Sequence, residues 1–416
     1  MFNKKASLFV LSLVAMGMAS CGGGGGDSAD LTYWCPNGDN AVMAKLVENF
    51  KASNEEYAKL NIKLKANYGE GDTYAVLHKD LDAAADVILM ADNNIRSGVL
   101  AEELAEIKDD AFKSTVSAGA IAATSVGGKM YGYAYRADNS PMPIYDSSVL
   151  SAEDVKSFET ILQKSKAAGK KVYFDFGNGW YNATLLWTGG GSFTINADGK
   201  LATNVGGTGS ARAGVAKGLE AYKALFNSYK DTFVSSSDSG LIEAGFKDGS
   251  ISYAFLWNDM AAIKANNANA AVATWPTINV DGVAKNMDCF ASYKAVVCKD
   301  NPKNADRQKL AIAFAAFISN KASQKVRMDE LQYGPSNLEL LASEDVKKLP
   351  FVEKIGEMEK AQRTHSQALS TTDDFWTPMA NLGGLITNGK DTWGDYANAG
   401  KALDALVSNQ GWVVEG

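Results

Sequence analysis

Histidine and cysteine are scarce in this chain of 416 residues, which has two histidines and four cysteines. His78 and His365 are too few for a histidine-rich metal centre, and they make a histidine-based catalytic triad improbable. No Cys-x-x-Cys pair occurs, so neither a zinc site nor a dithiol redox motif is expected. We therefore expect no metal, no cofactor and no catalytic residue.

Basic clusters and long apolar runs are also missing from most of the chain. The formal net charge is −7, and no cluster of lysine and arginine stands out, which argues against nucleic-acid binding. Beyond the first 20 residues no stretch reaches the ~18 consecutive apolar residues of a membrane-spanning helix. Membrane association therefore has to come from the N-terminus.

The N-terminus has the features of a secretory signal, which we assign to residues 1–20. Two lysines, Lys4 and Lys5, precede an almost wholly apolar stretch that runs from Ala6 to Met18. The residues Met18-Ala19-Ser20-Cys21 resemble the bacterial lipobox, although Met is less usual than Leu at its first position. The resemblance implies cleavage before Cys21 and lipidation of that cysteine; the alternative is an ordinary signal followed by an incidental cysteine.

An unbroken glycine run, Gly22–Gly26, follows Cys21. Such a run cannot pack and keeps maximal backbone freedom, so residues 21–30 are interpreted as a lipidated cysteine and a flexible tether. Two or three acyl chains would hold the protein on a membrane, where a single chain would not. The expected location is therefore the outer face of the cytoplasmic membrane, the periplasm or the cell surface.

The remaining chain of about 390 residues is too long for one ordinary hydrophobic core, so two domains are expected. Strand and helix patterns alternate along it, which predicts α/β architecture with parallel sheets covered by helices. The main predicted strands are Leu31–Trp34, Leu60–Ala66, Asp86–Met90, Lys129–Tyr133, Lys171–Phe176, Ser250–Trp257 and Ala295–Val297. The main predicted helices are Ala41–Ser53, Asp154–Gly169, Ala211–Phe226, Gly240–Phe246, Ala305–Ile318, Met379–Ile386 and Gly400–Val407.

Two aspartates, Asp39 and Asp92, follow predicted strands directly. In parallel sheets, ligands bind at loops beyond the carboxyl ends of the strands, so both are candidate ligand contacts. Each could instead cap the N-terminus of the helix that follows it. Cys35, Cys289 and Cys298 could contain one disulfide, between Cys289 and Cys298, or could all be buried free thiols.

Several short motifs, in order along some 250 residues, resemble the family 1 extracellular solute-binding proteins of bacterial ABC importers. They are Asn37-Gly38-Asp39 after the first strand, Ala85-Asp86-Val87-Ile88, Ser97-Gly98-Val99-Leu100, Gly128-Lys129-Met130-Tyr131-Gly132, Ile144-Tyr145-Asp146, Ser157-Phe158-Glu159-Thr160-Ile161 and Phe246-Lys247-Asp248-Gly249. Each motif alone is weak, and the shared order is the stronger signal.

The resemblance implies two α/β lobes joined by a hinge, each with a mostly parallel sheet flanked by helices. It places residues 30–140 and 285–341 in lobe 1, and residues 141–284 and 342–416 in lobe 2. The chain should cross between lobes near Asn139–Pro143, near Val280–Lys285 and after Gly334-Pro335-Ser336. A small solute would bind in the cleft, and the lobes would close on it.

Three tryptophans, Trp180, Trp257 and Trp376, occupy predicted loops where the family has stacking aromatics, and Tyr181 lies beside the first of them. Sugars present apolar C–H faces that stack on aromatic rings and hydroxyls that need paired donors and acceptors. The resemblance therefore predicts sugar binding by these rings, although most tryptophans belong to cores.

By the same resemblance, Asp39, Asn40 and Asp92 provide polar contacts to the solute, and Asn139 takes the place of a sugar-binding carboxylate. A shift of one position would put Asp138 there instead. The partners that the resemblance implies are a small solute of the sugar class, the permease subunits of an ABC importer and a membrane reached through the lipid anchor. The protein itself is expected to be a monomer.

Other classes compete with this interpretation. A binding protein for a polyamine or another small solute would share the scaffold, and the acidic pair Asp373-Asp374 keeps that alternative open. A surface receptor or adhesin is a further alternative. A secreted glycosidase needs two carboxylates across a cleft, and no spacing in the chain singles out such a pair.

Overall fold

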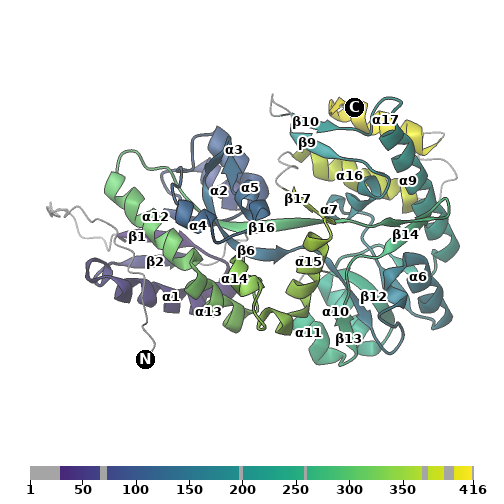
Figure 1. Cartoon of the computed structure of the whole chain (residues 1–416), viewed down its shortest axis with the longest axis horizontal. Coiled ribbons are helices and arrows are strands. Elements are labelled where there is room, and N and C mark those ends of the chain that lie inside the picture. Colours follow the sequence, from purple (N-terminus) through teal and green to yellow (C-terminus); the bar gives the residue numbers. More distant parts are fainter. Residues whose placement is uncertain are drawn as a thin grey trace, which may run out of the picture.

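Two separate β-sheets, joined by long strands, organise the computed structural model of this chain (Figure 1). The structure describes residues 29–65, 73–195, 200–256, 260–367, 373–387 and 398–414. We call the part around the first sheet lobe 1 and the part around the second sheet lobe 2. Cys21 and the tether lie outside the described residues.

The lobe 1 sheet has the strand order β17-β16-β3-β1-β2, and β6 also pairs with β16. Its strands are β1 (Leu31–Trp34), β2 (Ile62–Lys65), β3 (Val87–Ala91), β6 (Gly132–Asn139), β16 (Cys289–Cys298) and β17 (Thr364–Ser366). β1 is parallel to β2 and β3, whereas β16 is antiparallel to both β3 and β6. β3 is buried along its whole length, which explains its continuous apolar sequence.

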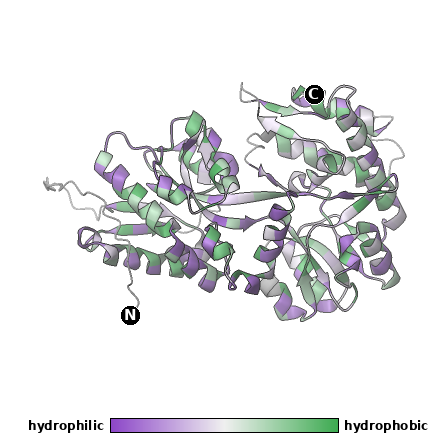
Figure 2. Ribbon diagram, viewed as in Figure 1, coloured by the Kyte–Doolittle hydropathy of each residue, from purple (hydrophilic) through white to green (hydrophobic). Residues whose placement is uncertain are grey.

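Helices cover both faces of the lobe 1 sheet. They are α1 (Asn40–Ser53), α2 (Thr73–Lys79), α3 (Ile95–Leu100), α4 (Asp110–Lys113), α5 (Ala118–Ala123), α12 (Ala305–Ser319) and α13 (Lys321–Leu331). Because successive side chains of a strand point to opposite faces, Tyr33 joins one core with Phe50 and Phe314, and Trp34 joins the other with Ile95. Figure 2 shows hydrophobic and hydrophilic residues alternating along the long helices, as expected for helices that bury one face.

The lobe 2 sheet has the strand order β11-β8-β12-β7-β13. Its strands are β7 (Met142–Asp146), β8 (Lys171–Tyr173), β11 (Phe233–Val234), β12 (Ile251–Leu256) and β13 (Ala270–Val272). The helices of lobe 2 are α6 (Phe158–Ala167), α7 (Gly179–Asn182), α8 (Thr184–Trp187), α9 (Ser210–Tyr229), α10 (Ser239–Asp248), α11 (Met260–Asn266), α15 (Pro350–Lys360), α16 (Asp373–Thr387) and α17 (Ala399–Gln410). One large apolar core joins most of them.

Smaller elements complete the fold. They are a three-stranded sheet of β9 (Phe193–Ile195), β10 (Leu201–Thr203) and β18 (Val413–Val414), the hairpin β14 (Thr277–Val280) with β15 (Val283–Asn286), the pair β4 (Ser125–Val126) with β5 (Lys129–Met130), and helix α14 (Leu338–Leu341).

The chain passes between the lobes through the strands in the middle of Figure 1. β6 ends in the lobe 1 sheet at Asn139, and β7 begins in the lobe 2 sheet at Met142. The predicted crossing at Val280–Lys285 is wrong, because these residues form the turn and second strand of the β14–β15 hairpin, and β14 packs against α6 and α9 of lobe 2. The chain reaches lobe 1 only along β16, which it enters at Cys289.

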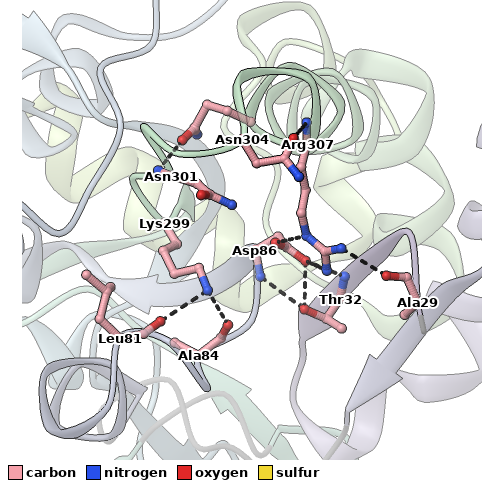
Figure 3. Close-up of polar contacts among 10 residues, drawn as sticks. Ala29, Thr32, Leu81, Ala84, Asp86, Lys299, Asn301, Asn304 and Arg307 are labelled. Atoms are coloured by element: carbon pink, nitrogen blue, oxygen red, sulfur yellow. Dashed lines mark hydrogen bonds and ion pairs between the residues drawn. The ribbon is translucent and has the colours of Figure 1, made fainter. Parts of the chain in front are cut away.

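A charged network fixes the edge of lobe 1 where the described chain begins (Figure 3). Arg307 donates two hydrogen bonds to Asp86, of 2.6 and 2.8 Å, and a third of 2.9 Å to the carbonyl of Ala29. Thr32 donates to the same carboxylate from its backbone N–H and its hydroxyl, both at 2.8 Å. Nearby, Lys299 Nζ donates to the carbonyls of the 81–84 turn.

Cys35, Cys289 and Cys298 are buried free thiols, so the Cys289–Cys298 disulfide that the sequence left open is not formed. The two cysteines lie at opposite ends of the same strand, β16, which separates them by its full length. Among the described helices, none is long and apolar enough to span a bilayer. Among the described residues, no group of three or more acidic, histidine or cysteine side chains could hold a metal ion.

Candidate functional site

The carboxyl ends of strands from the two lobes face each other. In lobe 1, β3 and β6 both run antiparallel to β16, so they share one direction, and β6 ends at the crossing into lobe 2. In lobe 2, β12 runs antiparallel to β7 and parallel to β8, and Leu256 at its end lies opposite Met142. The carboxyl ends of β1, β3, β8 and β12 therefore point toward the region between the lobes, which is where open α/β sheets bind ligands.

The lobe 1 side of this region is polar. The Asp39 carboxylate is fully buried and accepts a 2.6 Å hydrogen bond from the Tyr333 hydroxyl. The Arg136 guanidinium lies over the Tyr333 ring at 3.4 Å and pairs with both oxygens of Asp138, at 2.9 and 3.2 Å. Asp138 also accepts from the backbone N–H of Gly334. These residues join the end of β1, the end of β6 and the segment after α13 in one network.

Asp39 does not cap its own helix. It occupies the N-cap position of α1, yet its side chain makes no capping hydrogen bond. The carboxylate instead pairs with Tyr333, and burial together with the Asp39 charge raises the pKa of the Tyr333 hydroxyl, against the opposing effect of Arg136. The capping alternative for Asp39 is therefore wrong, and its partner comes from a segment almost 300 residues away.

Asp92, predicted as an open polar contact in a loop, is only 1% exposed. Its Oδ1 accepts from Gln367 Nε2 at 2.7 Å and from the Asn93 N–H at 3.0 Å, and its Oδ2 accepts from the Tyr293 N–H at 3.1 Å. Burial raises the pKa of this carboxyl to about 6, although the hydrogen bonds oppose that shift. The structure therefore gives Asp92 partners inside the protein, whereas the sequence offered it as a ligand contact or a helix cap.

The lobe 2 side of the region is aromatic. Phe290 at the start of β16 is surrounded by rings whose centroids lie 4.7–5.8 Å from its own, and we call these residues the Phe290 cluster. Its other members are Trp180, Trp187, Phe375 and Trp376. Trp180 is 9% exposed and Trp376 is half-buried. Trp180 and Trp376, two of the three candidate stacking residues, therefore lie in one cluster around a phenylalanine.

Close packing of two helices brings Trp180 and Trp376 together. Gly179, the first residue of α7, lies so near α16 that a methyl group in its place would collide with the carbonyl of Trp376. Trp180 follows Gly179 directly, and its backbone N–H is capped by the Asn178 side chain at 2.9 Å. The Gly-Asn-Gly turn thus sets both the start of α7 and its distance from α16.

The remaining predicted residues have different surroundings. Tyr181 is fully buried in the lobe 2 core, edge-on to Phe174, so its ring belongs to that core and is not exposed to a ligand in this structure. Asn40 is exposed at the first position of α1. Asn139 is half-buried and donates to the Ser292 hydroxyl across the hinge strands. Trp257 lies outside the described residues.

Sequence reasoning missed Arg136, Tyr333, Phe290 and Gln367. Arg136 had a usable signal, because Arg136 and Asp138 are two residues apart in a strand and share a face. The other three had no such signal. Gln367 in particular follows β17, a three-residue strand that pairs with β16 more than 70 positions earlier in the chain.

A profile of the bacterial extracellular solute-binding proteins matches residues 45–354. The chain belongs to this family. That membership identifies it as a solute-binding protein. None of the curated protein sequences compared with this chain matches it.

Solved structures with the same fold cover almost the whole chain. The maltodextrin-binding protein MalE1 from L. casei BL23, solved without ligand, is 24% identical over 91% of this chain and 98% of its own, with a TM-score of 0.78. A structure solved with acarbose is 26% identical over the same shares, with a TM-score of 0.75. A cyclo/maltodextrin-binding protein complexed with maltotetraose is 20% identical over 93% of this chain and 97% of its own, with a TM-score of 0.71. The two-lobed fold predicted from the sequence is confirmed.

Proposed function

We propose that this solute-binding protein captures a sugar, of the maltodextrin class, between its lobes and delivers it to the membrane subunits of an ABC importer. The observation that carries the proposal is that the Phe290 cluster lies beside polar groups of lobe 1, because the Gln367 amide bonds to Trp180 of the cluster and to Asp92. Aromatic faces suit the C–H surfaces of a pyranose, and the charged groups suit its hydroxyls.

The solved relatives support the choice of sugar class. Their names or bound molecules are maltodextrin, acarbose and maltotetraose, and each covers more than nine tenths of this chain. An aromatic stack adds about 0.5–1.5 kcal/mol beyond burial, whereas micromolar binding requires about 8 kcal/mol. Hydrogen bonds and lobe closure must therefore contribute most of the affinity.

Within this proposal the ligand contacts come from both lobes. Trp376 offers a half-exposed ring, and Trp180 lies behind it in the same cluster. On the lobe 1 side, the Asp39–Tyr333 pair and Asp138 lie at the strand ends, and the exposed Asn40 follows. Trp257 and Asn139 remain predicted contacts, the first at the end of β12 and the second at the hinge.

We also propose that the chain acts from a membrane surface, without catalysis and as a monomer. Family membership supports an extracytoplasmic site of action, and the lipobox-like Met18-Ala19-Ser20-Cys21 supports a lipid anchor at Cys21. Incorporation of an alkyne-tagged fatty acid into the full chain, absent in Cys21→Ser, is the expected result. Labelling that survives Cys21→Ser would reject the anchor.

The sugar assignment is tested on the full chain carrying Cys21→Ser, which cannot be acylated at that position. Calorimetric titration with maltotetraose, maltose and acarbose should give micromolar binding of at least one, and a thermal shift that grows with ligand concentration. Spermidine should give neither effect. Binding of spermidine alone would replace the sugar by a polyamine, and release of glucose from maltotetraose would point to an enzyme.

A further inference from the structure

Gln367 links the two sides of the candidate site through its amide. Its Oε1 accepts a 2.9 Å hydrogen bond from Trp180 Nε1 of α7 in lobe 2. Its Nε2 donates to Asp92 Oδ1 at 2.7 Å and to Asn93 Oδ1 at 3.2 Å, both in lobe 1. The side chain is 5% exposed, so these bonds form away from bulk water.

The chemistry of the partners fixes the orientation of this amide. An indole N–H can only donate, so the oxygen of Gln367 must face Trp180. An ionised carboxylate can only accept, so the NH₂ group must face Asp92. In a flipped amide the NH₂ group would face the indole N–H, and the oxygen would face the carboxylate. Neither pair can form a hydrogen bond, so the flipped orientation is excluded.

The backbone at Gln367 is held as well. It directly follows β17, whose three residues pair in parallel with Cys289, Phe290 and Ala291 of β16. The first half of β16 carries Phe290, which contacts the Trp180 ring at a centroid distance of 5.8 Å. Trp180 is therefore held at two points, by ring packing on β16 and by the hydrogen bond from its nitrogen to the segment after β17.

We infer that Gln367 is a positioning residue that sets the orientation of the Trp180 indole and couples it to the Asp92 loop of the opposite lobe. The consequence for sugar binding rests on the function proposed above; the coupling itself does not. A lost or altered amide would leave a buried indole N–H and a buried carboxylate without this partner, so the ring and the loop would both change their surroundings.

The coupling makes the Trp180 indole a reporter of the charge on Asp92. Asp92 Oδ1 accepts two N–H donors and Oδ2 accepts one, so a proton that removes the negative charge weakens these hydrogen bonds, including the one from Gln367. Among the described residues, two charged or titratable groups face Asp92, and both are on β16. The Lys294 side chain favours the ionised form of Asp92, and the Tyr293 hydroxyl is the other group. The pKa of Asp92, raised to about 6 by burial, puts the titration in an accessible range.

The first experiment needs no ligand. The indole ¹H–¹⁵N signal of Trp180, assigned by its loss in Trp180→Phe, is followed from pH 4.5 to 8 in the full chain with Cys21→Ser. We expect slow hydrogen exchange and a chemical shift that titrates near pH 6. In Gln367→Leu the titration should vanish and the exchange should quicken by roughly tenfold or more. An unchanged indole signal in Gln367→Leu would overturn the inference.

Gln367→Glu tests the same coupling in a variant that keeps the shape of the side chain. One carboxylate oxygen can still accept from Trp180, whereas the other now faces Asp92 and repels its charge. The indole should remain protected, and its titration midpoint should move above that of the wild type. A midpoint that stays in place would contradict a direct Gln367–Asp92 contact. Gln163→Leu, an exposed site on α6, is the matched control and should change nothing.

Maltotetraose binding separates this inference from the proposed function. If the wild type binds it, Gln367→Leu should raise the Kd roughly tenfold, and Gln367→Glu should bind less well at pH 8 than at pH 5. An unchanged Kd in both variants would reject a role of Gln367 in ligand binding. If the indole experiment succeeds but no sugar binds the wild type, the proposed function fails and the interlobe coupling stands.

Discussion

Two aspartates at opposite ends of one strand have opposite chemistry. Asp86 precedes β3 and Asp92 follows it, about 20 Å away along the strand. Burial alone would raise the pKa of both. At Asp86 the hydrogen bonds from Arg307 and Thr32 outweigh burial and lower the pKa, whereas at Asp92 burial prevails and the pKa rises to about 6.

The difference lies in the partners that each end of the sheet provides. Asp86 lies at the edge remote from lobe 2 and pairs with a guanidinium in two-point geometry (Figure 3). Asp92 lies at the edge that faces lobe 2 and receives N–H groups from a backbone and an amide. A carboxylate paired with a guanidinium stays ionised and stabilises the fold. A buried carboxylate held by neutral donors has a raised pKa, so its charge changes with pH near neutrality.

The largest expected effect is the loss of stability when Asp86, the aspartate paired with Arg307, is replaced. Asp86→Ala removes two of the three hydrogen bonds that Arg307 donates and both of those from Thr32, and should lower the free energy of unfolding by about 3–4 kcal/mol in urea titrations. Affinity for a sugar should not change in the folded protein. Glu330→Ala, which breaks the exposed Lys45–Glu330 pair of the same lobe, should cost less than about 1 kcal/mol. Equal costs for the two variants would refute the contrast.

The second effect is the pH dependence of the stability that Asp92 contributes. The folded-state pKa of Asp92 lies above its ordinary value of 3.8, so its contribution to stability is fully present below about pH 4 and is lost as the pH rises through 6. Asp92→Asn has no such titration. Between pH 4 and pH 7.5 the wild type should therefore lose up to about 3 kcal/mol of unfolding free energy relative to Asp92→Asn.

Asp86 supplies the control of opposite sign for that measurement. Its folded-state pKa is lowered, so its contribution is present above about pH 4 and is lost as the pH falls below its ordinary pKa. Asp86→Asn should therefore differ most from wild type at neutral pH. Parallel stability curves for wild type and Asp92→Asn across this range would show that Asp92 is not buried as described.

The third effect concerns the aromatic side of the site. Trp376→Ala removes a half-exposed ring from the Phe290 cluster and should weaken maltotetraose binding roughly 30-fold, or about 2 kcal/mol, in calorimetric titrations. Trp376→Phe should recover part of the loss because it keeps a stacking face. If Trp376→Ala binds as tightly as wild type, the cluster supports the hinge and does not contact ligand.

The smallest effect is expected from reduction. β16 begins at Cys289 in the lobe 2 core and ends at Cys298 opposite Val87, next to the Asp86 network. One thiol therefore lies near each of the two regions compared above. Burial raises the pKa of both thiols. A reducing agent should leave the Tm unchanged, and maleimide should label neither cysteine in the native state. A fall in Tm on reduction would reveal a disulfide that the structure does not contain.

Local patterns predicted most elements well. The predicted helices Ala41–Ser53 and Ala305–Ile318 differ from α1 and α12 by one residue at one end. The predicted helix Asp154–Gly169 is interrupted. A short 3-10 turn comes first, and α6 then begins at Phe158, where the Ser157 side chain caps it by accepting from the Thr160 N–H. The predicted strand Ala295–Val297 is the end of the ten-residue β16, whose first half supports the hinge.

The site was predicted less completely than the fold. Trp180 and Trp376 were chosen as candidates because each follows a distinctive local motif, and the structure packs both rings on Phe290. Tyr181 was included only for its adjacency to Trp180, and the helical turn of α7 sends its ring into the core. Gln367 and Tyr333 were missed because their partners lie more than 100 residues away in the chain, whereas Arg136 was missed although its spacing from Asp138 on β6 was a usable signal.

The sequence by itself determined the periodicities that make strands and helices, the absence of histidine-rich and dithiol sites, and the strand-end positions of Asp39 and Asp92. Only the tertiary structure decided what those strand-end groups do, because burial and hydrogen-bond partners are properties of the packed chain. Asp86 and Asp92 are the same residue type at the two ends of the five-residue strand β3, and one is paired with Arg307 while the other is joined through Gln367 to an indole of the opposite lobe.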